Sequence, residues 1–299
     1  MNIAFFLEVL AGGLLAGVMY SLVALGFVLI YKASGVFNFA QGAMVFFAAL
    51  TFVSLLEHGW NFWLAMAATF AVMIVLGVLI ERVVLRPLVN QPQITLFMAT
   101  IGLTFVLEGL SQLVWGSQPH GLELGIADVP MEWLSEKANI SISQFDLFAA
   151  AVAGVLVAVL AVLFQKTRIG RALRAVADDH QAALAVGIPL QHIWAIVWAV
   201  AGSVALVAGL MWGARNGVQY ALAFLALKAL PVLILGGFES VPGAIVGGLI
   251  IGASEKLAEV YIGPYFGGGL ESWFPYVLAL VFLLFRPEGL FGEKIIDRV

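Results

Sequence analysis

The sequence contains no cysteine, which excludes disulfides, thiolate metal sites, cysteine nucleophiles and iron–sulfur clusters. It has only four histidines, and they lie too far apart for a metal-binding spacing such as HExxH. A GxxxxGK(S/T) phosphate loop, a nucleophile elbow and a dinucleotide fingerprint are also missing. These absences argue against an enzyme, and they predict no metal and no cofactor held by this chain itself.

Charge is scarce as well. Only 11% of the 299 residues are charged, against about 25% in an average soluble domain. Hydrophobic residues make up 63%, and the mean hydropathy is +1.05. Several runs reach the roughly 18–20 apolar residues that a helix needs to cross a bilayer. We therefore expect an all-α, polytopic transmembrane helical bundle that forms a single membrane-spanning domain over residues 1–299.

The apolar segments predict eight or nine spans. No Lys or Arg precedes Lys32, so the N-terminal segment indicates a first span rather than a cleavable signal. Two short Gly-rich segments flank Glu239, and one of them could be a re-entrant hairpin instead of a full span. The predicted segments are Phe5–Tyr31, Asn38–Leu56, Phe62–Arg82, Thr95–Trp115, Phe145–Gln165, His192–Gly213, Leu222–Gly237, Val241–Ile262 and Ser272–Phe285.

The cations predict the orientation of these spans. If the polar segment 166–190 is cytosolic, alternation places ten of the fourteen cations on the cytosolic side. Lys137 and Arg215 are then external, and Lys228 and Lys256 lie within predicted spans. This is a strong positive-inside bias. It predicts an external N-terminus and a cytosolic C-terminus. The ten cations are Lys32, Arg82, Arg86, Lys166, Arg168, Arg171, Arg174, Arg286, Lys294 and Arg298.

Two polar loops stand out between the spans. The segment of about 116–144 is the largest external element, and its acidic and proline residues could dock a partner or simply form a solvated cap. The segment of about 166–190 carries four cations and then a short alanine-rich helix that ends at Gly187. A structured cytosolic element between two spans suggests a transport subunit that is driven by a separate motor.

Two predicted helix breaks are candidates for the translocation path. Glycine and proline are dense between Gly236 and Gly243, and broken backbone at membrane depth is tolerated only inside protein or beside a wet cavity. Helix ends there offer N–H groups to an anion such as a carboxylate. The second break holds Asn38 and Gln41, which share a helix face and can hydrogen-bond a zwitterion. Asn38 could equally be an N-cap.

Glu108 is the third candidate for the path. It lies about two turns from the external end of its predicted helix. Ionisable residues inside spans are costly and usually functional. Glu108 could line the path, pair with a cation such as Arg215, or extend outward. The predicted path residues are Asn38, Gln41, Glu108, Gly236, Gly237 and Gly243.

Five motifs together resemble the LivH-type permeases of branched-chain (hydrophobic) amino-acid ABC importers. The resemblance runs nearly end to end, and the motifs occur in the same order. They are GLLAGVMYSLVALGFVLIYKASGVFNFAQG at Gly13–Gly42, ATIGLTFVLEGLSQLVWG at Ala99–Gly116, TRIGRALRAVADDHQAALAVGI at Thr167–Ile188, LKALPVLILGGFESVPGAIVGGLIIG at Leu227–Gly252 and LLFRPEGLFGE at Leu283–Glu293.

The resemblance implies a set of partners. Such a permease pairs with a second, related permease, two cytosolic ATPases that bind ATP and Mg, and a periplasmic binding protein. It also implies a coupling helix at about Arg171–Gly187 that contacts the ATPase. Gln41 stands where the family has histidine, which keeps hydrogen bonding but removes a titratable group. The predicted coupling residues are Thr167, Arg168, Gly170, Arg171, Arg174, Ala175, Asp178, Ala182 and Gly187.

We therefore expect a permease subunit in a bacterial inner membrane that moves branched-chain or other hydrophobic amino acids by ATP-driven import. Its partners would be the subunits named above and the lipid bilayer, with no nucleic acid. Two alternatives remain open: a urea or short-amide permease of the same ABC class, and an ion-coupled secondary amino-acid transporter. The latter would need internal acids or histidines and would work alone.

Overall fold

The computed structural model describes residues 3–88, 91–138, 140–178 and 180–292. These residues form helices joined by turns, with two isolated β-bridges, which confirms the all-α class. The helices are α1 (Ile3–Ser34), α2 (Gln41–Glu57), α3 (Phe62–Leu79), η1 (Ile80–Leu85), η2 (Arg86–Leu88), α4 (Gln93–Trp115), α5 (Glu132–Ala138), α6 (Gln144–Lys166), α7 (Arg168–Asp178), α8 (His180–Ala185), α9 (Leu190–Asn216), η3 (Tyr220–Phe224), α10 (Leu225–Gly236), α11 (Val241–Tyr261), α12 (Gly263–Phe266), η4 (Leu270–Ser272) and α13 (Phe274–Phe285).

Six helices of the described chain are long and apolar enough to cross a membrane. They are Ile3–Ser34, Phe62–Leu88, Gln93–Trp115, Gln144–Lys166, Leu190–Asn216 and Val241–Tyr261. The other three predicted segments fall on shorter apolar helices: Gln41–Glu57, Tyr220–Gly236 and Phe274–Phe285. The chain is thus a multi-pass membrane protein. The count of eight or nine crossings stays a prediction.

The residues cluster into two compact units, each built from separate stretches of sequence. The first unit comprises Met1–Ala24, Glu123–Leu156 and Leu227–Val299. The second comprises Leu25–Leu122 and Val157–Ala226. The boundaries fall inside α1, α6 and α10, so these helices contribute to both units.

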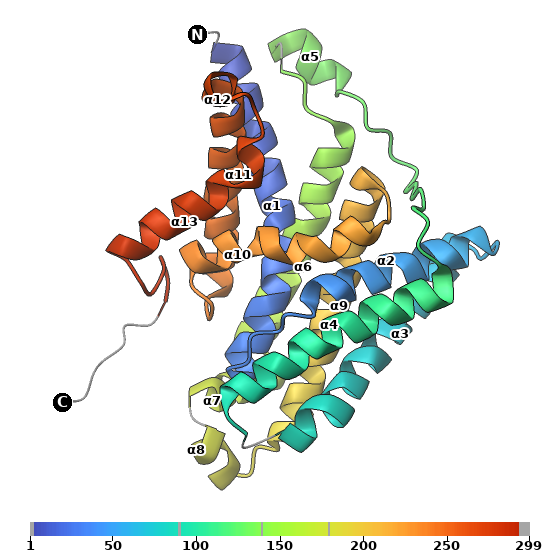
Figure 1. Ribbon diagram of the computed structural model, residues 1–299, viewed down its shortest axis with the longest axis vertical. Coiled ribbons are helices and arrows are strands. Elements are labelled where there is room, and N and C mark those ends of the chain that lie inside the picture. The colour runs from blue at the N-terminus through green and yellow to red at the C-terminus, as the bar shows by residue number, and fades with distance from the viewer. Residues whose placement is uncertain (1–2, 89–90, 139, 179, 293–299) are drawn as a thin grey trace. The chain divides into compact units, whose positions relative to one another are not determined.

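In the second unit, α9 packs against both α2 and α3, and α2 also packs against α4 (Figure 1). Small residues allow these close approaches. A Cβ atom at Gly77 of α3 would lie 2.5 Å from the Trp198 carbonyl oxygen of α9, and one at Gly209 would lie 2.6 Å from the Val45 carbonyl oxygen of α2. In lipid, close backbone packing of this kind is a main source of helix association.

Contacts at the two ends of the second unit show that its helices alternate in direction. At one end, the Trp194 indole of α9 donates to the Ala33 carbonyl of α1 at 3.1 Å. At the other end, His120, which follows α4, forms a β-bridge with Val218, which follows α9. The His120 imidazole also lies 2.8 Å from the Glu57 carboxylate at the end of α2. The ends of α2, α4 and α9 therefore lie on one side.

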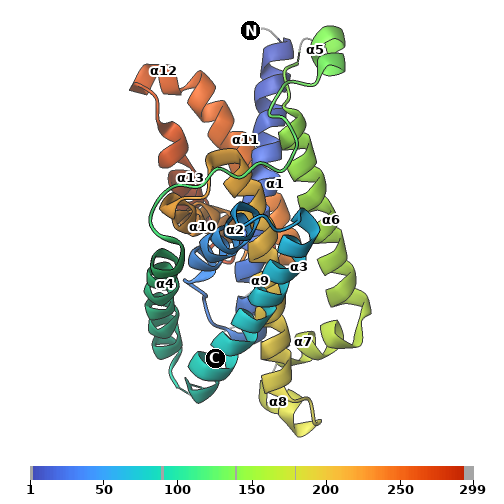
Figure 2. The same cartoon turned by 90° about the vertical axis from the view of Figure 1, so that its right-hand side faces the viewer.

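In the first unit, α1 and α11 run side by side in both views (Figures 1 and 2). Their backbones touch through glycines, since a Cβ atom at Gly13 would lie 2.7 Å from the Gly252 carbonyl oxygen. Gly17 and Gly248 make a second contact of the same kind. Gly13 and Gly17 are four residues apart, as are Gly248 and Gly252, and such spacing lets the two helix backbones approach closely.

Candidate functional site

The turn between α6 and α7 is tightly built. The Thr167 hydroxyl accepts a hydrogen bond from the Gly170 amide at 3.1 Å, so Thr167 caps the first turn of α7. A Cβ atom at Gly170 would lie 2.5 Å from the Phe164 carbonyl carbon. The Arg174 guanidinium donates to the Phe164 carbonyl oxygen at 2.7 Å, which satisfies a carbonyl at the end of α6. Three predicted coupling residues thus shape the turn itself.

Beyond this turn, the chain is helical on both sides of residue 179, which lies outside the described residues: α7 ends at Asp178 and α8 begins at His180, within the segment where the sequence predicts a helix from about Arg171 to Gly187. They lie between α6 and the start of α9 (Figure 2), and they contact each other and α9. The inner face is formed by Leu173, Val176 and Ala183, which are buried.

The other predicted coupling residues lie on or near the outer face of this helix pair. Arg168, Arg171, Ala182 and Gly187 are exposed, and Ala175 is half-buried. Gly187 has φ +83°, a conformation that favours glycine and ends α8. The side chain of Asp178 lies outside the described residues. The exposed set therefore combines cations with small residues, which suits close docking of another surface.

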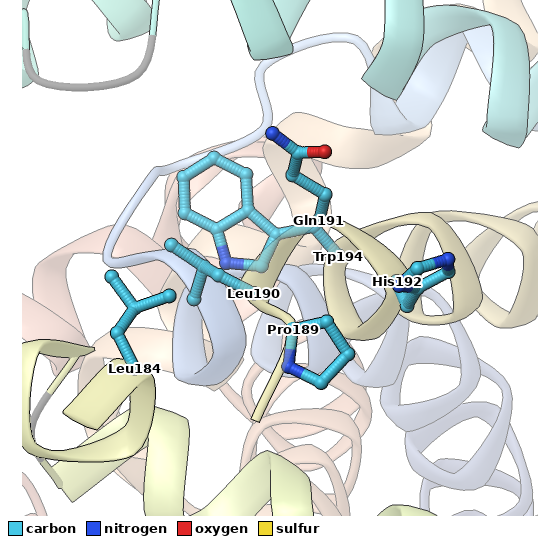
Figure 3. Close-up of a pocket in the computed structure, with 6 residues that line it drawn as sticks. All are labelled: Leu184, Pro189, Leu190, Gln191, His192 and Trp194. Carbon is cyan, nitrogen blue, oxygen red and sulfur yellow. The ribbon is translucent and has the colours of Figure 1, made fainter. Parts of the chain in front are cut away.

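A pocket of about 230 Å³ lies where α8 is followed by α9 (Figure 3). Its walls are largely apolar, and the indole of Trp194 is fixed by its hydrogen bond to Ala33. The pocket has the size and character to receive an apolar side chain. It is lined by Leu184, Pro189, Leu190, Gln191, His192 and Trp194.

The connection between α1 and α2 holds the predicted carboxamide pair. Asn38 and Gln41 are both fully buried. The Asn38 amide nitrogen donates to the Gln41 side-chain oxygen at 3.2 Å, and the Asn38 oxygen accepts from the Ala40 amide at 3.1 Å. Asn38 is therefore not the N-cap of α2. That position belongs to Ala40, which makes no side-chain cap bond.

Aromatic side chains surround this connection. The rings of Phe27 and Phe37 stack at 4.9 Å, and Phe39 packs edge-on against Phe97 of α4. The Thr100 hydroxyl accepts from the Phe39 amide at 3.2 Å, and its single proton is shared between the Phe97 carbonyl oxygen at 2.8 Å and the Phe37 carbonyl oxygen at 3.1 Å. Side chains, rather than solvent, thus form hydrogen bonds with the backbone of this irregular segment, as a membrane helix bundle requires.

Gln41 points at the backbone of α1. A Cβ atom at Gly26 would overlap the Gln41 side-chain nitrogen, so any larger residue at this position would force the Gln41 amide to move. This nitrogen is buried and has no hydrogen-bond partner among the described residues. A buried donor without a partner is costly, which makes Gln41 a candidate for contact with a ligand.

Glu108 is buried in α4 with a partner that the sequence does not predict. The Tyr220 hydroxyl, at the start of η3, donates to the Glu108 carboxylate at 3.0 Å. The Tyr220 ring in turn packs edge-on against Phe46 of α2 and Phe224. Glu108 therefore links α4 to the segment that follows α9.

The break between α10 and α11 is closed by backbone contacts. Gly237 has φ +99° and follows the last residue of α10. A Cβ atom at Gly236 would overlap the Gly243 carbonyl oxygen, and one at Gly243 would overlap that of Gly236. The Ser240 hydroxyl caps α11 by accepting from the Gly243 amide at 3.0 Å. The end of one helix and the start of the next are thus packed against each other.

Residues after α13 complete this closure. The Leu290 amide donates to the Leu235 carbonyl at 2.8 Å, and the Phe291 amide donates to the Gly236 carbonyl at 3.2 Å. These bonds satisfy carbonyls at the end of α10 that the helix itself leaves open. Leu290 and Phe291 lie in the motif LLFRPEGLFGE at Leu283–Glu293, which by itself does not indicate these bonds. Both residues follow Gly289, which has φ +85° and turns the chain back toward α10.

The described residues contain no group of three His, Asp or Glu side chains that could hold a metal ion. Apolar helices of spanning length, together with helix breaks that are closed by contacts within the protein, define a multi-pass membrane protein.

Comparison with known protein families shows which kind of membrane protein this is. Residues 9–285 match the family described as "Branched-chain amino acid transport system / permease component". The chain belongs to this family. It is therefore a permease component of an ABC importer complex and not an enzyme. The family does not favour the two alternatives that the sequence leaves open, the urea or short-amide permease and the ion-coupled transporter.

Relatives match over nearly the whole chain. The "High-affinity branched-chain amino acid transport system permease protein LivH" of Escherichia coli (strain K12) is 29% identical, covering 99% of this chain and 98% of that protein. The corresponding protein BraD of Pseudomonas aeruginosa is also 29% identical, with 98% of each covered. These matches confirm the resemblance stated from the five motifs.

A solved structure shares the fold. The structure described as "PsaBC from Streptococcus pneumoniae in complex with Fab" superimposes with a TM-score of 0.50 and 14% sequence identity. The alignment covers 95% of this chain and 94% of the other. At this identity the likeness concerns the helical architecture alone.

Proposed function

We propose that this chain is the membrane permease of an ATP-driven importer for branched-chain or other hydrophobic amino acids, located in a bacterial inner membrane. The observation that carries the proposal is the match to permease relatives over 98–99% of the chain. The names of these relatives specify branched-chain amino acids. The polar, cation-bearing helix pair between two apolar helices fits a subunit that is moved by a motor outside the membrane.

The orientation follows from charge and alternation. We place the N-terminus outside and the C-terminus in the cytosol, with nine crossings by α1, α2, α3, α4, α6, α9, the η3–α10 segment, α11 and α13. This assignment puts ten of the fourteen cations on the cytosolic side. It also agrees with the shared side of the ends of α2, α4 and α9. The bond from Leu290 to Leu235 likewise joins two segments that the assignment makes cytosolic.

The α7–α8 pair serves as the coupling element in this proposal. ATP binding would close two cytosolic ATPase subunits, which hold ATP and Mg, and the resulting movement would be applied to the outer face of α7 and α8. Arg168, Arg171 and Ala182 lie on that face, while Thr167, Gly170 and Arg174 make the turn stiff. A stiff turn transmits movement to α6 instead of absorbing it. The adjacent pocket would receive an apolar ATPase side chain.

The substrate would arrive from a periplasmic binding protein and pass through a pathway completed by a second permease subunit. The buried amide of Gln41 would offer a hydrogen bond to the passing amino acid, because it has a donor that no described residue satisfies. Asn38 would hold Gln41 in place through its 3.2 Å bond. The contacts of the other predicted path residues are described above. These residues are Glu108, Gly236, Gly237 and Gly243.

Reconstituted vesicles that carry the full complex test the proposal. Wild-type complex should accumulate leucine only with ATP and the binding protein. Ala182→Arg should lower that uptake by about tenfold or more, because a charge buried without a partner at the docking face costs at least about 1.4 kcal/mol. Ala127→Arg is the matched control, since Ala127 is an exposed alanine in the loop 116–144.

Normal uptake in the Ala182→Arg complex would contradict the role of α8. Uptake by this chain alone in an ion gradient would contradict ATP-driven import altogether.

A further inference from the structure

The first unit contains a cluster of three polar side chains from three helices. The Tyr20 hydroxyl of α1 donates to the Glu255 carboxylate of α11 at 3.0 Å. The Lys228 ammonium of α10 lies 3.4 Å from the same carboxylate oxygen and 3.5 Å from the Tyr20 hydroxyl. It also lies 5.7 Å from the centre of the Tyr20 ring. None of these residues belongs to the predicted path or the coupling element.

The cluster lies at membrane depth. Tyr20 is near the middle of α1, about 26 Å along the helix from Ile3 and about 21 Å from Ser34 at 1.5 Å per residue, and Glu255 is about 9 Å from the end of α11 at Tyr261. The hydrocarbon core of a bilayer is about 30 Å thick. A lysine and a glutamate at this depth are costly unless they are paired or face water, so a functional role is the first expectation.

The two charges are held differently. The side chain of Glu255 is only 4% exposed, whereas that of Lys228 is 37% exposed. The distances from Lys228 to its partners exceed the usual range for charge-assisted bonds, which is about 2.7–2.9 Å. The Lys228 ammonium is therefore held only weakly by these partners, and its exposed side can still donate hydrogen bonds. A lysine cannot expose its ammonium to lipid tails at this depth without a large cost, so its open side indicates a water-accessible surface.

Tyr20 and Glu255 are placed by the glycine contacts between α1 and α11. Tyr20 follows Gly17 by three residues, and Glu255 follows Gly252 by three residues. A Cβ atom at Gly252 would lie 2.5 Å from the Gly17 amide nitrogen, so the two backbones touch at that level. The position of the carboxylate is thus set by close backbone packing before any ligand arrives.

We infer that Lys228 binds the α-carboxylate of the transported amino acid as it passes through the membrane. Glu255 and Tyr20 are positioning residues that hold the ammonium and neutralise it when no substrate is present. An incoming carboxylate replaces Glu255 as the partner of Lys228, and Glu255 takes Lys228 back when the substrate leaves. Such an exchange makes binding brief, which suits passage rather than storage. This inference rests on the proposed amino-acid import function.

A pair of variants separates substrate binding from a structural ion pair. Lys228→Met removes the ammonium but leaves Glu255 buried and unpaired, whereas Lys228→Met with Glu255→Gln removes both charges. At equal amounts of assembled complex, we expect leucine uptake to fall by about tenfold or more in both, because a charge-assisted hydrogen bond to the substrate is lost. Lys228→Arg should retain most of the uptake. Normal uptake in the double variant would overturn the inference, since it would show that only charge balance matters.

The cysteine-free chain allows a second measurement in the same complex. The Lys228→Cys variant should react with a hydrophilic, charged methanethiosulfonate reagent, and leucine-loaded binding protein should slow the reaction during ATP-driven cycling. The Leu280→Cys variant is the control, because Leu280 is an apolar residue of α13 with 61% exposure. Equally low reactivity of the two variants would overturn the inference, and so would labelling of Lys228→Cys that substrate never slows.

Uptake by the wild-type complex separates a failure of the proposed import function from a failure of the proposed role of Lys228. If it fails to take up leucine with ATP, the proposed function is wrong. If it takes up leucine and the Lys228 variants do so equally well, only the role of Lys228 is wrong.

Discussion

The two helix breaks of this permease are closed in opposite ways. Between α1 and α2, side chains close the break: Asn38 bonds to Gln41, and the Thr100 hydroxyl accepts from the Phe39 amide. Between α10 and α11, the backbone itself closes the break, since Gly236 and Gly243 touch directly. The first break can exchange hydrogen-bond partners by rotating side chains, whereas the second admits no added atom.

The turn between α6 and α7 combines a close glycine backbone contact with a side-chain hydrogen bond. Gly170 brings the α7 backbone against Phe164, and Thr167 caps the helix through its hydroxyl. We therefore expect substitutions at the glycine-closed break to damage folding. Substitutions at side-chain contacts should have smaller effects, which a second substitution can offset. Three experiments test that ranking.

The largest expected effect is at the α10–α11 break. Gly236→Ala should destabilise the protein by about 1–3 kcal/mol, because the added methyl group overlaps backbone that cannot rotate away. Thermal unfolding of the purified protein measures this change. Gly102→Ala is the matched control, since a Cβ atom at Gly102 of α4 meets nothing within 4 Å. Equal unfolding temperatures for Gly236→Ala and wild type would contradict the account.

An intermediate effect is expected where Gly26 faces Gln41. Gly26→Ala alone should destabilise, because its methyl group overlaps the Gln41 amide. Gly26→Ala combined with Gln41→Ala should recover stability, giving a coupling energy of about 0.5–3 kcal/mol in a double-mutant cycle. Strictly additive effects would mean that the two residues do not compete for the same space.

The smallest effect concerns the cap of α7. Thr167→Ala should cost about 1 kcal/mol, the usual cost of losing an N-cap hydroxyl. Thr167→Ser keeps the hydroxyl and should be close to wild type in thermal unfolding. If serine and alanine at position 167 destabilised equally, the hydroxyl would not be the stabilising group.

The sequence predicts some of these features and not others, for physical reasons. Gly, Pro and Asn mark the breaks near Asn38 and Gly237 because backbone conformation is a local property. Hydropathy likewise locates the apolar helices, since spanning length is local. Arg174 stays a predicted coupling residue, and its bond to the Phe164 carbonyl is a contact that the local pattern does not show.

Contacts between distant segments could not be predicted in this way. Glu108 meets Tyr220 across 112 residues, and Tyr20 meets Glu255 across 235 residues. Nothing in the local pattern of either residue names its partner. The bond from Leu290 to Leu235 is likewise a property of the folded chain, because it depends on how α10 and the residues after α13 come together.

The most direct test of the account is the side of the membrane on which α7 lies. The chain has no cysteine, so the Arg171→Cys variant carries a single thiol at an exposed position of α7. A membrane-impermeant maleimide should label this thiol in inside-out vesicles but not in intact cells. The Glu123→Cys variant, with its thiol in the loop 116–144, should show the reverse. Labelling of the Arg171→Cys variant from outside intact cells would invert the orientation and contradict coupling to a cytosolic ATPase.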